Sequence, residues 1–185
     1  MGPRHDFDRE WREHPTPGSP ALWVTRAWAP ALQPGRVLLD LGCGTGRHSL
    51  AWAKAGGIAH AIDASAAALA AVAAACGALP VHTRRLDLDQ SHHRLPRADV
   101  VIAARILYLL EAPLQLVDRA LHAVRPGGML LLGDQTTLLD EVQQHLGGRA
   151  SWQRASASHL LVRPLVDALP DATPSHRAYC ATESS

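Results

Sequence analysis

The stretch RVLLDLGCGTGRHSL, residues 36–50, decides the fold that this sequence predicts. It begins with the apolar run VLLDL, which lacks the polar alternation of a half-exposed strand and is typical of a buried parallel strand. Glycines follow at positions 42, 44 and 46, and a helical pattern runs from about Thr45 to Ala55. A strand, a glycine-rich turn and a helix in this order are typical of the place where an open α/β sheet binds nucleotide-like ligands. The alternative is a tight turn that binds nothing.

Apolar runs and helical patterns alternate along the chain on both sides of this stretch. The expected strands are residues 37–41, 58–63, 81–86, 99–104 and 129–134, and the expected helices are residues 19–32, 45–55, 65–76, 112–124 and 138–146. Ser65 suits the N-cap of the third of these helices, and Gly77 suits its end. The pattern predicts a doubly wound, Rossmann-like α/β sheet with helices on both faces.

The C-terminal part is expected to be abbreviated, because the sequence after Asp134 offers one clear strand pattern, at Ser175 to Thr182. Leu160 to Leu169 contains Pro164 and fits neither a helix nor a strand. A chain of 185 residues with 47% hydrophobic content is enough for one domain. We expect a helical lid or cap in residues 1–34, the cofactor-binding core in residues 35–134, and a short substrate-side region in residues 135–185.

The spacing of the glycines indicates which ligand the turn holds. A dinucleotide fingerprint reads G-x-G-x-x-G/A, whereas this turn reads G-x-G-x-G and has Arg47 at the third position, which argues against a nicotinamide-dependent reductase. Asp40 precedes the turn and suits a cationic amino group better than a diphosphate. Asp63 ends the second strand, where a carboxylate can accept both hydroxyls of a ribose. A ribose beside an ammonium group, without a diphosphate, describes S-adenosyl-L-methionine (SAM).

Four segments in order resemble the motifs of class I SAM-dependent methyltransferases. VLLDLGCGTGRHSL is similar to their first motif, AIDAS to the acid of the second strand, RRLDLDQ to the third-strand segment, and ADVVIAARILYLL with RPGGMLLLGD to the fourth and fifth strands. The resemblance covers residues 36–134. The segment GRHSLAWAKAGG, with the N-terminal Trp and Pro residues, is similar to the small tellurite-resistance and thiopurine-type methyltransferases, which act on small molecules.

The resemblance implies a role for individual residues in holding the cofactor. These residues are Gly42, Cys43, Gly44 and Gly46 of the turn, for the methionine part with Asp40 nearby; Asp63 for the ribose; Ala64 beside the adenine; and Asp87 with the Leu88 amide at the adenine edge. Asp89 competes with Asp87, because the segment LDLD can slip by two residues without changing face.

The end of the fourth strand is where we expect the acceptor of the methyl group to bind. Tyr108 and Arg105 are the candidate catalytic residues there: Tyr108 to face the sulfonium or orient an acceptor, and Arg105 to attract an anionic substrate. A Tyr packed into the next helix and an Arg covering apolar surface are the alternatives. The Asn-Pro-Pro-Tyr sequence that marks amino-group methylation in many relatives is absent, which disfavours such acceptors.

Other residues are candidates for a metal site, a general base or a lid. No metal is expected, because Asp134-Gln135 lacks a third carboxylate partner at Ala104-Arg105. His48 and His159 are candidate general bases. Core packing is the expected role of Trp23 and Trp28, whereas for Trp11 a lid over the cofactor and plain packing stay equally open.

Charge and cysteine usage give expectations for partners and compartment. Lys and Arg total 18 against 17 for Asp and Glu, so the net charge of +1 predicts neither nucleic acid nor a membrane as partner, and a small-molecule substrate is expected. Three widely spaced cysteines and the polar N-terminus predict a cytoplasmic protein. The function expected is methyl transfer from SAM to a small-molecule N, O or S nucleophile. The alternative is a catalytically silent SAM-binding regulatory or partner subunit.

Overall fold

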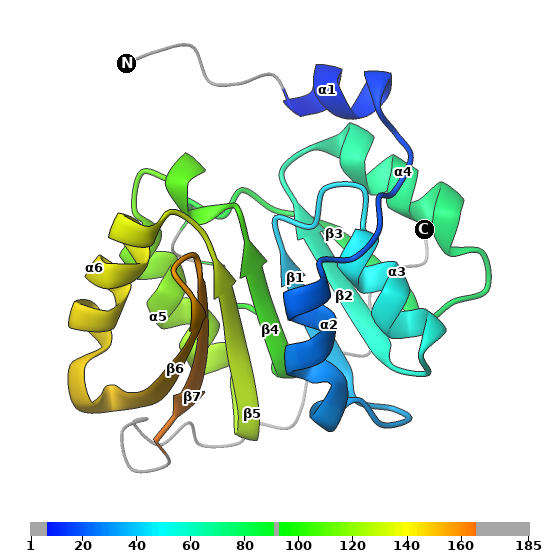
Figure 1. Ribbon diagram of the computed structural model, residues 1–185. Coiled ribbons are helices and arrows are strands. Elements are labelled where there is room, and N and C mark those ends of the chain that lie inside the picture. The colour runs from blue at the N-terminus through cyan, green and yellow to red at the C-terminus, as the bar shows by residue number, and fades with distance from the viewer. Residues whose placement is uncertain (1–6, 91–92, 166–185) are drawn as a thin grey trace.

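A seven-stranded mixed sheet forms the centre of the protein in the computed structural model, which describes residues 7–90 and 93–165 (Figure 1). Its strand order is β3-β2-β1-β4-β5-β7-β6. The strands are β1 (Val37–Leu41), β2 (Ile58–Asp63), β3 (Val81–Arg85), β4 (Ala98–Ala104), β5 (Val124–Gly133), β6 (Ala150–Ser156) and β7 (His159–Pro164). β1 to β5 pair in parallel, and β7 and β6 complete the sheet in antiparallel orientation. The carboxyl ends of the first five strands therefore share one edge.

Helices cover both faces of the sheet, as the doubly wound pattern predicts. The helices are α1 (Phe7–Glu13), α2 (Leu22–Trp28), α3 (Arg47–Lys54), α4 (Ala66–Cys76), α5 (Pro113–Ala123) and α6 (Thr136–Leu146), with short 3-10 turns η1 (Ala29–Ala31), η2 (Leu107–Leu109) and η3 (Gly147–Arg149). The core on one face joins β1, β4 and β5 to α5 and α6. On the other face, α2 and α3 pack over the same strands, and α4 packs over β2 and β3. The predicted Rossmann-like fold class is confirmed.

The local signals of α4 act as the sequence predicts. Ser65 accepts a hydrogen bond from the Ala68 amide through Oγ (3.1 Å), which satisfies an amide that the first turn of the helix leaves without a partner. Gly77 follows the last turn with a φ of +55°, a conformation that favours glycine.

The C-terminal part of the sheet differs from the sequence-based expectation. Two strands, β6 and β7, follow α6, where the sequence indicated one strand after Asp134. β7 occupies the first half of the segment that fitted neither state, and Pro164 stands at its end, opposite Ala150 of the edge strand. The strand expected at Ser175 to Thr182 lies outside the described residues. The expectation of a single late strand is therefore corrected to a pair that extends the sheet beyond β5.

The N-terminal part also differs. The sequence analysis missed α1, and α2 begins at Leu22 with Ala21 at its N-cap, so Ser19 does not cap it. Trp28 is 4% exposed and packs against Trp52, so its predicted core position is confirmed. Trp23 stacks on His159, with ring centroids 4.2 Å apart, and links α2 to β7.

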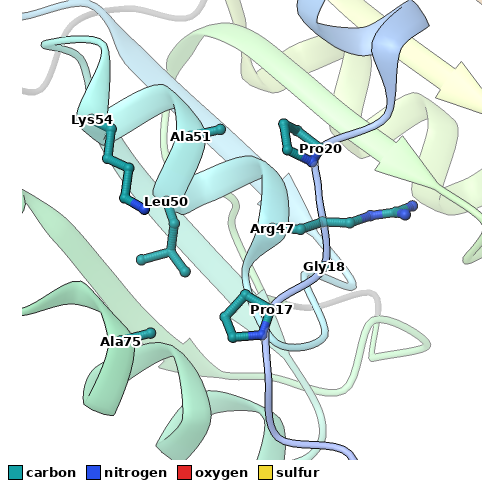
Figure 2. A pocket seen from close by; sticks show the side chains of 8 residues that line it. All are labelled: Pro17, Gly18, Pro20, Arg47, Leu50, Ala51, Lys54 and Ala75. Atoms are coloured by element: carbon teal, nitrogen blue, oxygen red, sulfur yellow. The ribbon is translucent and has the colours of Figure 1, made fainter.

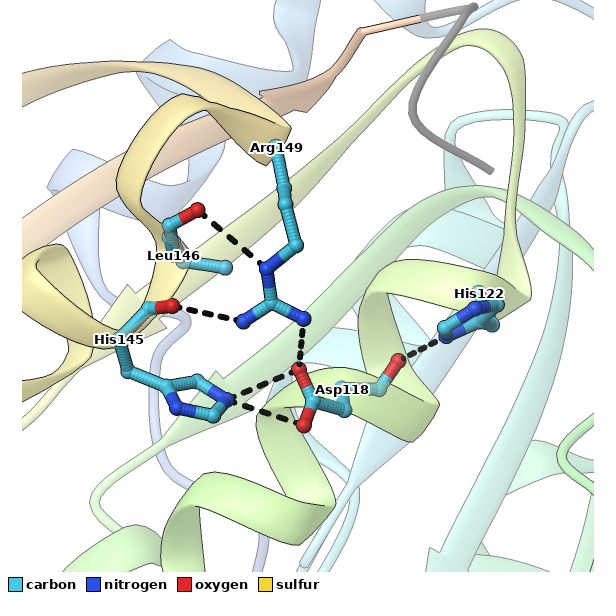
Figure 3. Close-up of polar contacts among 5 residues, drawn as sticks. All are labelled: Asp118, His122, His145, Leu146 and Arg149. Carbon is cyan, nitrogen blue, oxygen red and sulfur yellow. Dashed lines mark hydrogen bonds and ion pairs between the residues drawn. The ribbon is translucent and has the colours of Figure 1, made fainter. Parts of the chain in front are cut away.

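Charged side chains tie helices and strands together at two places away from the carboxyl edge. Buried Asp99, in β4, accepts from the Val37 amide (2.8 Å) and pairs with Arg36 (2.5 Å) and Arg125 (2.9 Å). Asp118 of α5 accepts from Arg149 and lies 2.9 Å from Nε2 of His145, so it joins α5 to the end of α6 (Figure 3). The first cluster holds β1, β4 and β5 together near their amino ends, and the second holds α5 against the end of α6.

Candidate functional site

The glycine-rich turn joins β1 to α3 in a conformation that needs its three glycines. Gly42, Gly44 and Gly46 have φ values of +67°, +53° and +81°, in the left-handed region. A Cβ at Gly42 would lie 2.7 Å from Cγ1 of Ile106, and one at Gly46 would lie 2.8 Å from Cγ2 of Val72. Both the backbone conformation and the close neighbours therefore exclude larger residues here.

Internal hydrogen bonds use the amides of this turn. The Gly42 and Cys43 amides both donate to the carbonyl of Ile62 (2.8 and 3.0 Å), and the Gly46 amide donates to Cys43 (3.0 Å). These amides are thus not available to a phosphate, which a dinucleotide site would require. The turn fits a cofactor without a diphosphate, as the glycine spacing predicts.

Asp63 connects the turn to the second strand and to α4. Its Oδ2 accepts from the Gly44 amide (2.8 Å), and its Oδ1 accepts from the Ser65 amide (2.9 Å). Burial raises the pKa of Asp63, while the two amides oppose that rise. Each carboxylate oxygen can accept a second hydrogen bond, so the side chain can still accept from a ribose hydroxyl. The sequence analysis did not foresee that Asp63 also holds the turn.

Asp40 and Cys43 are buried side chains next to the turn. Oδ2 of Asp40 accepts from the amide (3.2 Å) and hydroxyl (2.7 Å) of Ser49, which fastens the first turns of α3 to β1. Burial raises the pKa of the Cys43 thiol well above its usual value, and the nearby carboxylates add to the rise. Cys43 is therefore a neutral packing residue, and its place in the site is that of its backbone.

The third-strand segment separates its two aspartates by their contacts. Oδ1 of Asp89 accepts from the amides of Glu111 (2.9 Å) and Ala112 (3.4 Å), and so holds the start of α5. Asp87 is half-buried. Its Oδ1 accepts a local hydrogen bond from the Asp89 amide (3.1 Å). This difference favours Asp87 over Asp89 as the residue at the adenine edge. Leu88 is buried beside them, and Ala64 is exposed at the end of β2.

The chain turns sharply after β4, where the candidate catalytic residues lie. Arg105 is exposed and has a φ of +62°, and its amide donates to the Gly133 carbonyl (2.6 Å). Left-handed backbone at a residue other than glycine is strained and often marks a functional site. Tyr108, in η2, is 45% exposed, so part of its side chain is open to solvent.

Asp134, at the end of β5, positions this turn and was not assigned that role from the sequence. Its Oδ2 accepts from the Leu107 amide (3.0 Å), next to Tyr108, and its Oδ1 accepts from the Gln135 amide (2.8 Å). Because both oxygens bind backbone amides, Asp134 anchors the turn that carries Tyr108. Only the three-dimensional fold brings these residues together, since 27 positions separate Leu107 from Asp134.

Helix α1 lies over the glycine turn and α4. A Cβ at Gly44 would lie 3.2 Å from Cζ2 of Trp11, so the indole ring covers that glycine. Asp8 accepts from the Ser65 hydroxyl (2.5 Å) and the Ala67 amide (3.2 Å), which fastens α1 to the start of α4. This position favours the lid interpretation of Trp11 over plain packing in a core, and it adds Asp8 as a residue that the sequence analysis missed.

The two candidate general bases occupy different surroundings. His48 is 3% exposed, and its Nε2 accepts from the Ala21 amide (3.3 Å), so it has a structural partner. His159 stacks on Trp23, and its Nδ1 lies 2.6 Å from the Ser156 hydroxyl. Its partner in the sheet is Gly133, so it lies near the carboxyl edge and stays the better placed of the two.

A hollow of about 340 Å³ lies between residues 17–20 and helices α3 and α4 (Figure 2). Its lining comprises Pro17, Gly18, Pro20, Arg47, Leu50, Ala51, Lys54 and Ala75. None of the residues predicted to bind the cofactor or acceptor lines it. The hollow is therefore separate from the predicted cofactor site.

The described residues contain neither a metal-binding cluster nor a membrane-spanning helix. Within residues 7–90 and 93–165, no group of three or more His, Cys, Asp or Glu side chains is arranged to hold a metal ion. In the same part of the chain, no helix is long and apolar enough to cross a membrane.

Comparison with known proteins identifies the family. A family profile described as "Methyltransferase domain" matches residues 39–130, from β1 into β5. The chain belongs to the class I SAM-dependent methyltransferases. These are enzymes whose cofactor is SAM, so the predicted family, enzyme class and cofactor are confirmed. Which residues of this chain hold the cofactor stays a prediction.

Curated relatives and solved structures give two different likenesses. The chain is 30% identical over 160 residues to a tRNA U34 carboxymethyltransferase of Hahella chejuensis, covering 79% of this chain and 46% of that protein. It is 29% identical over 175 residues to the enzyme of that name from Idiomarina loihiensis, covering 84% and 50%. The chain spans about half the length of these relatives.

Solved structures share the fold at low identity. TehB from Haemophilus influenzae superposes with a TM-score of 0.66 at 14% identity, covering 85% of this chain and 66% of that one. Magnesium protoporphyrin IX methyltransferase from Synechocystis, solved with bound SAM, gives a TM-score of 0.63 at 18% identity, covering 86% and 92%.

The curated relatives overturn one expectation, which concerns the substrate. Their names specify a nucleic acid substrate, so the prediction of a small-molecule substrate with no nucleic acid partner is contradicted. The error came from the net charge of +1, which sums over the whole chain and says nothing of where the charges lie.

Asp63→Ala is expected to weaken SAM binding by about 1–3 kcal/mol, because ribose hydroxyls lose their acceptor and the Gly44 amide loses its anchor. Calorimetric titration with SAM measures the change, and Asp140→Ala, on the exposed part of α6, is the matched control. An unchanged Kd in a folded Asp63→Ala protein would place the ribose elsewhere.

The stability of the protein is expected to fall as the pH drops from about 7.5 to about 5.5. Burial lowers the pKa of His48, and Nε2 can accept from Ala21 only when it carries no proton. The unfolded chain then binds more protons than the folded one, so stability is lost as the pH falls through the unfolded pKa near 6.5. His48→Gln keeps an acceptor and should reduce the pH dependence of urea unfolding. An equal dependence in both proteins would refute this assignment.

Proposed function

We propose that this chain transfers the methyl group of SAM to a nucleobase of a transfer RNA. The observation that carries the proposal is the similarity to tRNA U34 carboxymethyltransferases over 79–84% of the chain. The methyltransferase family supplies the cofactor and the reaction type. The acceptor comes from the relatives, and the carboxyl edge of the sheet offers the exposed groups that such an acceptor needs.

The residues at that edge fit SAM. In this proposal the methionine part lies against the backbone of the turn, which comprises Gly42, Cys43, Gly44 and Gly46. The buried carboxylate of Asp40 adds negative charge near the amino group of the cofactor. Asp63 binds the ribose, Ala64 lies beside the adenine, and Asp87 with the Leu88 amide meets the adenine edge. When bound, SAM supplies a methyl group activated on a sulfonium, so the protein chiefly aligns the acceptor with it.

Tyr108 and Arg105 are proposed to receive the acceptor. Tyr108 is an exposed phenol held in place through the Leu107 amide and Asp134. Arg105 presents an exposed guanidinium at the same turn, and this charge suits the phosphate or carboxylate of a substrate. Neither group needs to remove a proton when the acceptor is already anionic.

The acceptor atom is proposed to be other than an exocyclic amine. The chain has Arg105-Ile106-Leu107-Tyr108 where amino-methylating relatives carry Asn-Pro-Pro-Tyr. Uridine, the base named for the curated relatives, has no exocyclic amine, so the two observations agree. The proposal includes a cytoplasmic location, because that is where a tRNA substrate is found.

Incubation with methyl-labelled SAM and a transcribed tRNA bearing uridine at position 34 is expected to label the tRNA. Mass analysis of the digested nucleosides then identifies the modified base and shows whether it has gained one methyl group. Parallel reactions contain thiols and amines in place of tRNA. Labelling of these small molecules alone would overturn the tRNA acceptor, and SAM binding without any transfer would favour a silent SAM-binding subunit.

Tyr108→Phe is expected to leave SAM affinity nearly unchanged and to lower turnover about tenfold or more, equivalent to at least about 1.4 kcal/mol of transition-state stabilisation. Only the hydroxyl is removed, and the exposed ring stays in η2.

Arg105→Lys keeps the positive charge and removes the planar guanidinium, so it should raise the KM for tRNA more than it lowers kcat. Parent turnover in both variants would show that this turn does not receive the acceptor.

A further inference from the structure

Within residues 7–90 and 93–165, no helix covers one face of the sheet over β2 and β3. The helices that pack on β3 are α3 and α4, both on the opposite face, whereas α5 packs against β4 and β5 (Figure 1). The connection from β3 to β4, residues 86–97, has no helix in its described part. Parallel strands are usually joined by a helical crossover, which would cover this area. Leu86, Leu88 and Leu95 of the connection reach the core, and the strand residues farther out on this face, such as Arg84, are exposed.

Histidine and arginine side chains occupy the open face. His60 of β2 alternates with Ala59 and Ala61, which point into the opposite core, so His60 belongs to the open side. His60 pairs in register with His82 of β3, and their rings stack with centroids 5.2 Å apart. Arg84 lies two residues further along β3, on the same side, and is exposed. Its guanidinium donates to the Arg94 carbonyl (3.4 Å).

More arginines border this face at the amino edge of the sheet. Arg36 and Arg125 share buried Asp99, and their side chains are still 47% and 43% exposed. Arg125 is close enough to His60 to help lower its pKa, after burial and His82. Arg97 donates to the His122 carbonyl at the end of α5 (2.9 Å), and Arg97 and Arg94 are both exposed. One carboxylate thus pairs with two arginines here, which leaves an excess of positive charge.

We propose that this face binds the sugar-phosphate backbone of the RNA substrate. We name it the basic face and define it by Arg36, Arg84, Arg94, Arg97 and Arg125 with His60 and His82. Guanidinium groups bind phosphates through paired hydrogen bonds, and an RNA backbone offers a phosphate at every nucleotide. The inference rests on the proposed tRNA acceptor and adds where that RNA is held.

Distance and charge distribution support this occupant. His60 lies three residues before Asp63 on β2, which corresponds to about 10 Å along the strand. An RNA that places a base at the carboxyl edge can therefore lay its neighbouring phosphates on the basic face. The carboxylates Asp40, Asp63, Asp87 and Asp134 gather instead near the carboxyl edge, where they suit the cofactor and disfavour phosphates.

Arg84→Glu combined with Arg94→Glu tests the basic face. Neither side chain has a carboxylate partner among the described ion pairs, so the exchange should not disturb folding. The matched control is Arg26→Glu with Arg163→Glu, which makes the same change in net charge at exposed positions on α2 and β7. The probe is a transcribed tRNA bearing uridine at position 34, titrated by fluorescence anisotropy at several salt concentrations. Calorimetry with SAM checks that each protein keeps its cofactor site.

The double variant of the basic face is expected to bind tRNA at least about tenfold more weakly than the parent, and the slope of log K against log salt should fall by about 2. The control should lose less than about threefold. Equal losses in both variants would mean that only net charge matters, and would overturn the basic face while leaving tRNA methylation standing. If the parent labels tRNA and the double variant binds it as tightly, the basic face is wrong. If the parent binds and labels no tRNA, the proposed function fails first.

Discussion

The two oxygens of the Asp63 carboxylate hold the cofactor edge of this protein together. One accepts from Gly44 and fixes the glycine turn, and the other accepts from Ser65, the N-cap of α4. Ser65 in turn donates to Asp8 and so fastens α1, which places Trp11 over Gly44. Asp63 therefore joins β2, the turn and α4 directly, and it joins α1 through Ser65. The residue proposed to bind the ribose therefore also fixes the backbone around it.

The core from residue 36 to residue 134 was predictable because its signals are local. The run VLLDL, the glycine turn and Ser65 each specify a conformation from a few neighbouring residues, and parallel strands that alternate with helices leave few other topologies. The strand β6, ASWQRAS, gives no such signal: it lies at the edge of the sheet and Trp152 is 49% exposed. Helix α1 was missed because it is short and has no buried residue, so its sequence shows no apolar face.

The candidate site, like the fold, was predictable from the sequence only in part. Asp63 and the glycines follow from motif spacing, but the partners that make them a site come from distant parts of the chain. Asp134 reaches Leu107, and Asp8 reaches Ser65 across 57 positions, and neither pairing leaves a trace in the local sequence. The acceptor was the largest error, because a net charge near zero conceals acids that gather at one edge and arginines that gather on one face.

A crystal structure with S-adenosylhomocysteine tests the central claim most directly, since it locates the cofactor in relation to Asp63. The account predicts both ribose hydroxyls within hydrogen-bond distance of the Asp63 carboxylate. It also predicts the amino-acid portion over Gly44, with the Trp11 ring displaced to one side of it. A nucleoside bound in the hollow lined by Arg47 and Lys54, with Asp63 in contact only with Gly44 and Ser65, would contradict the account.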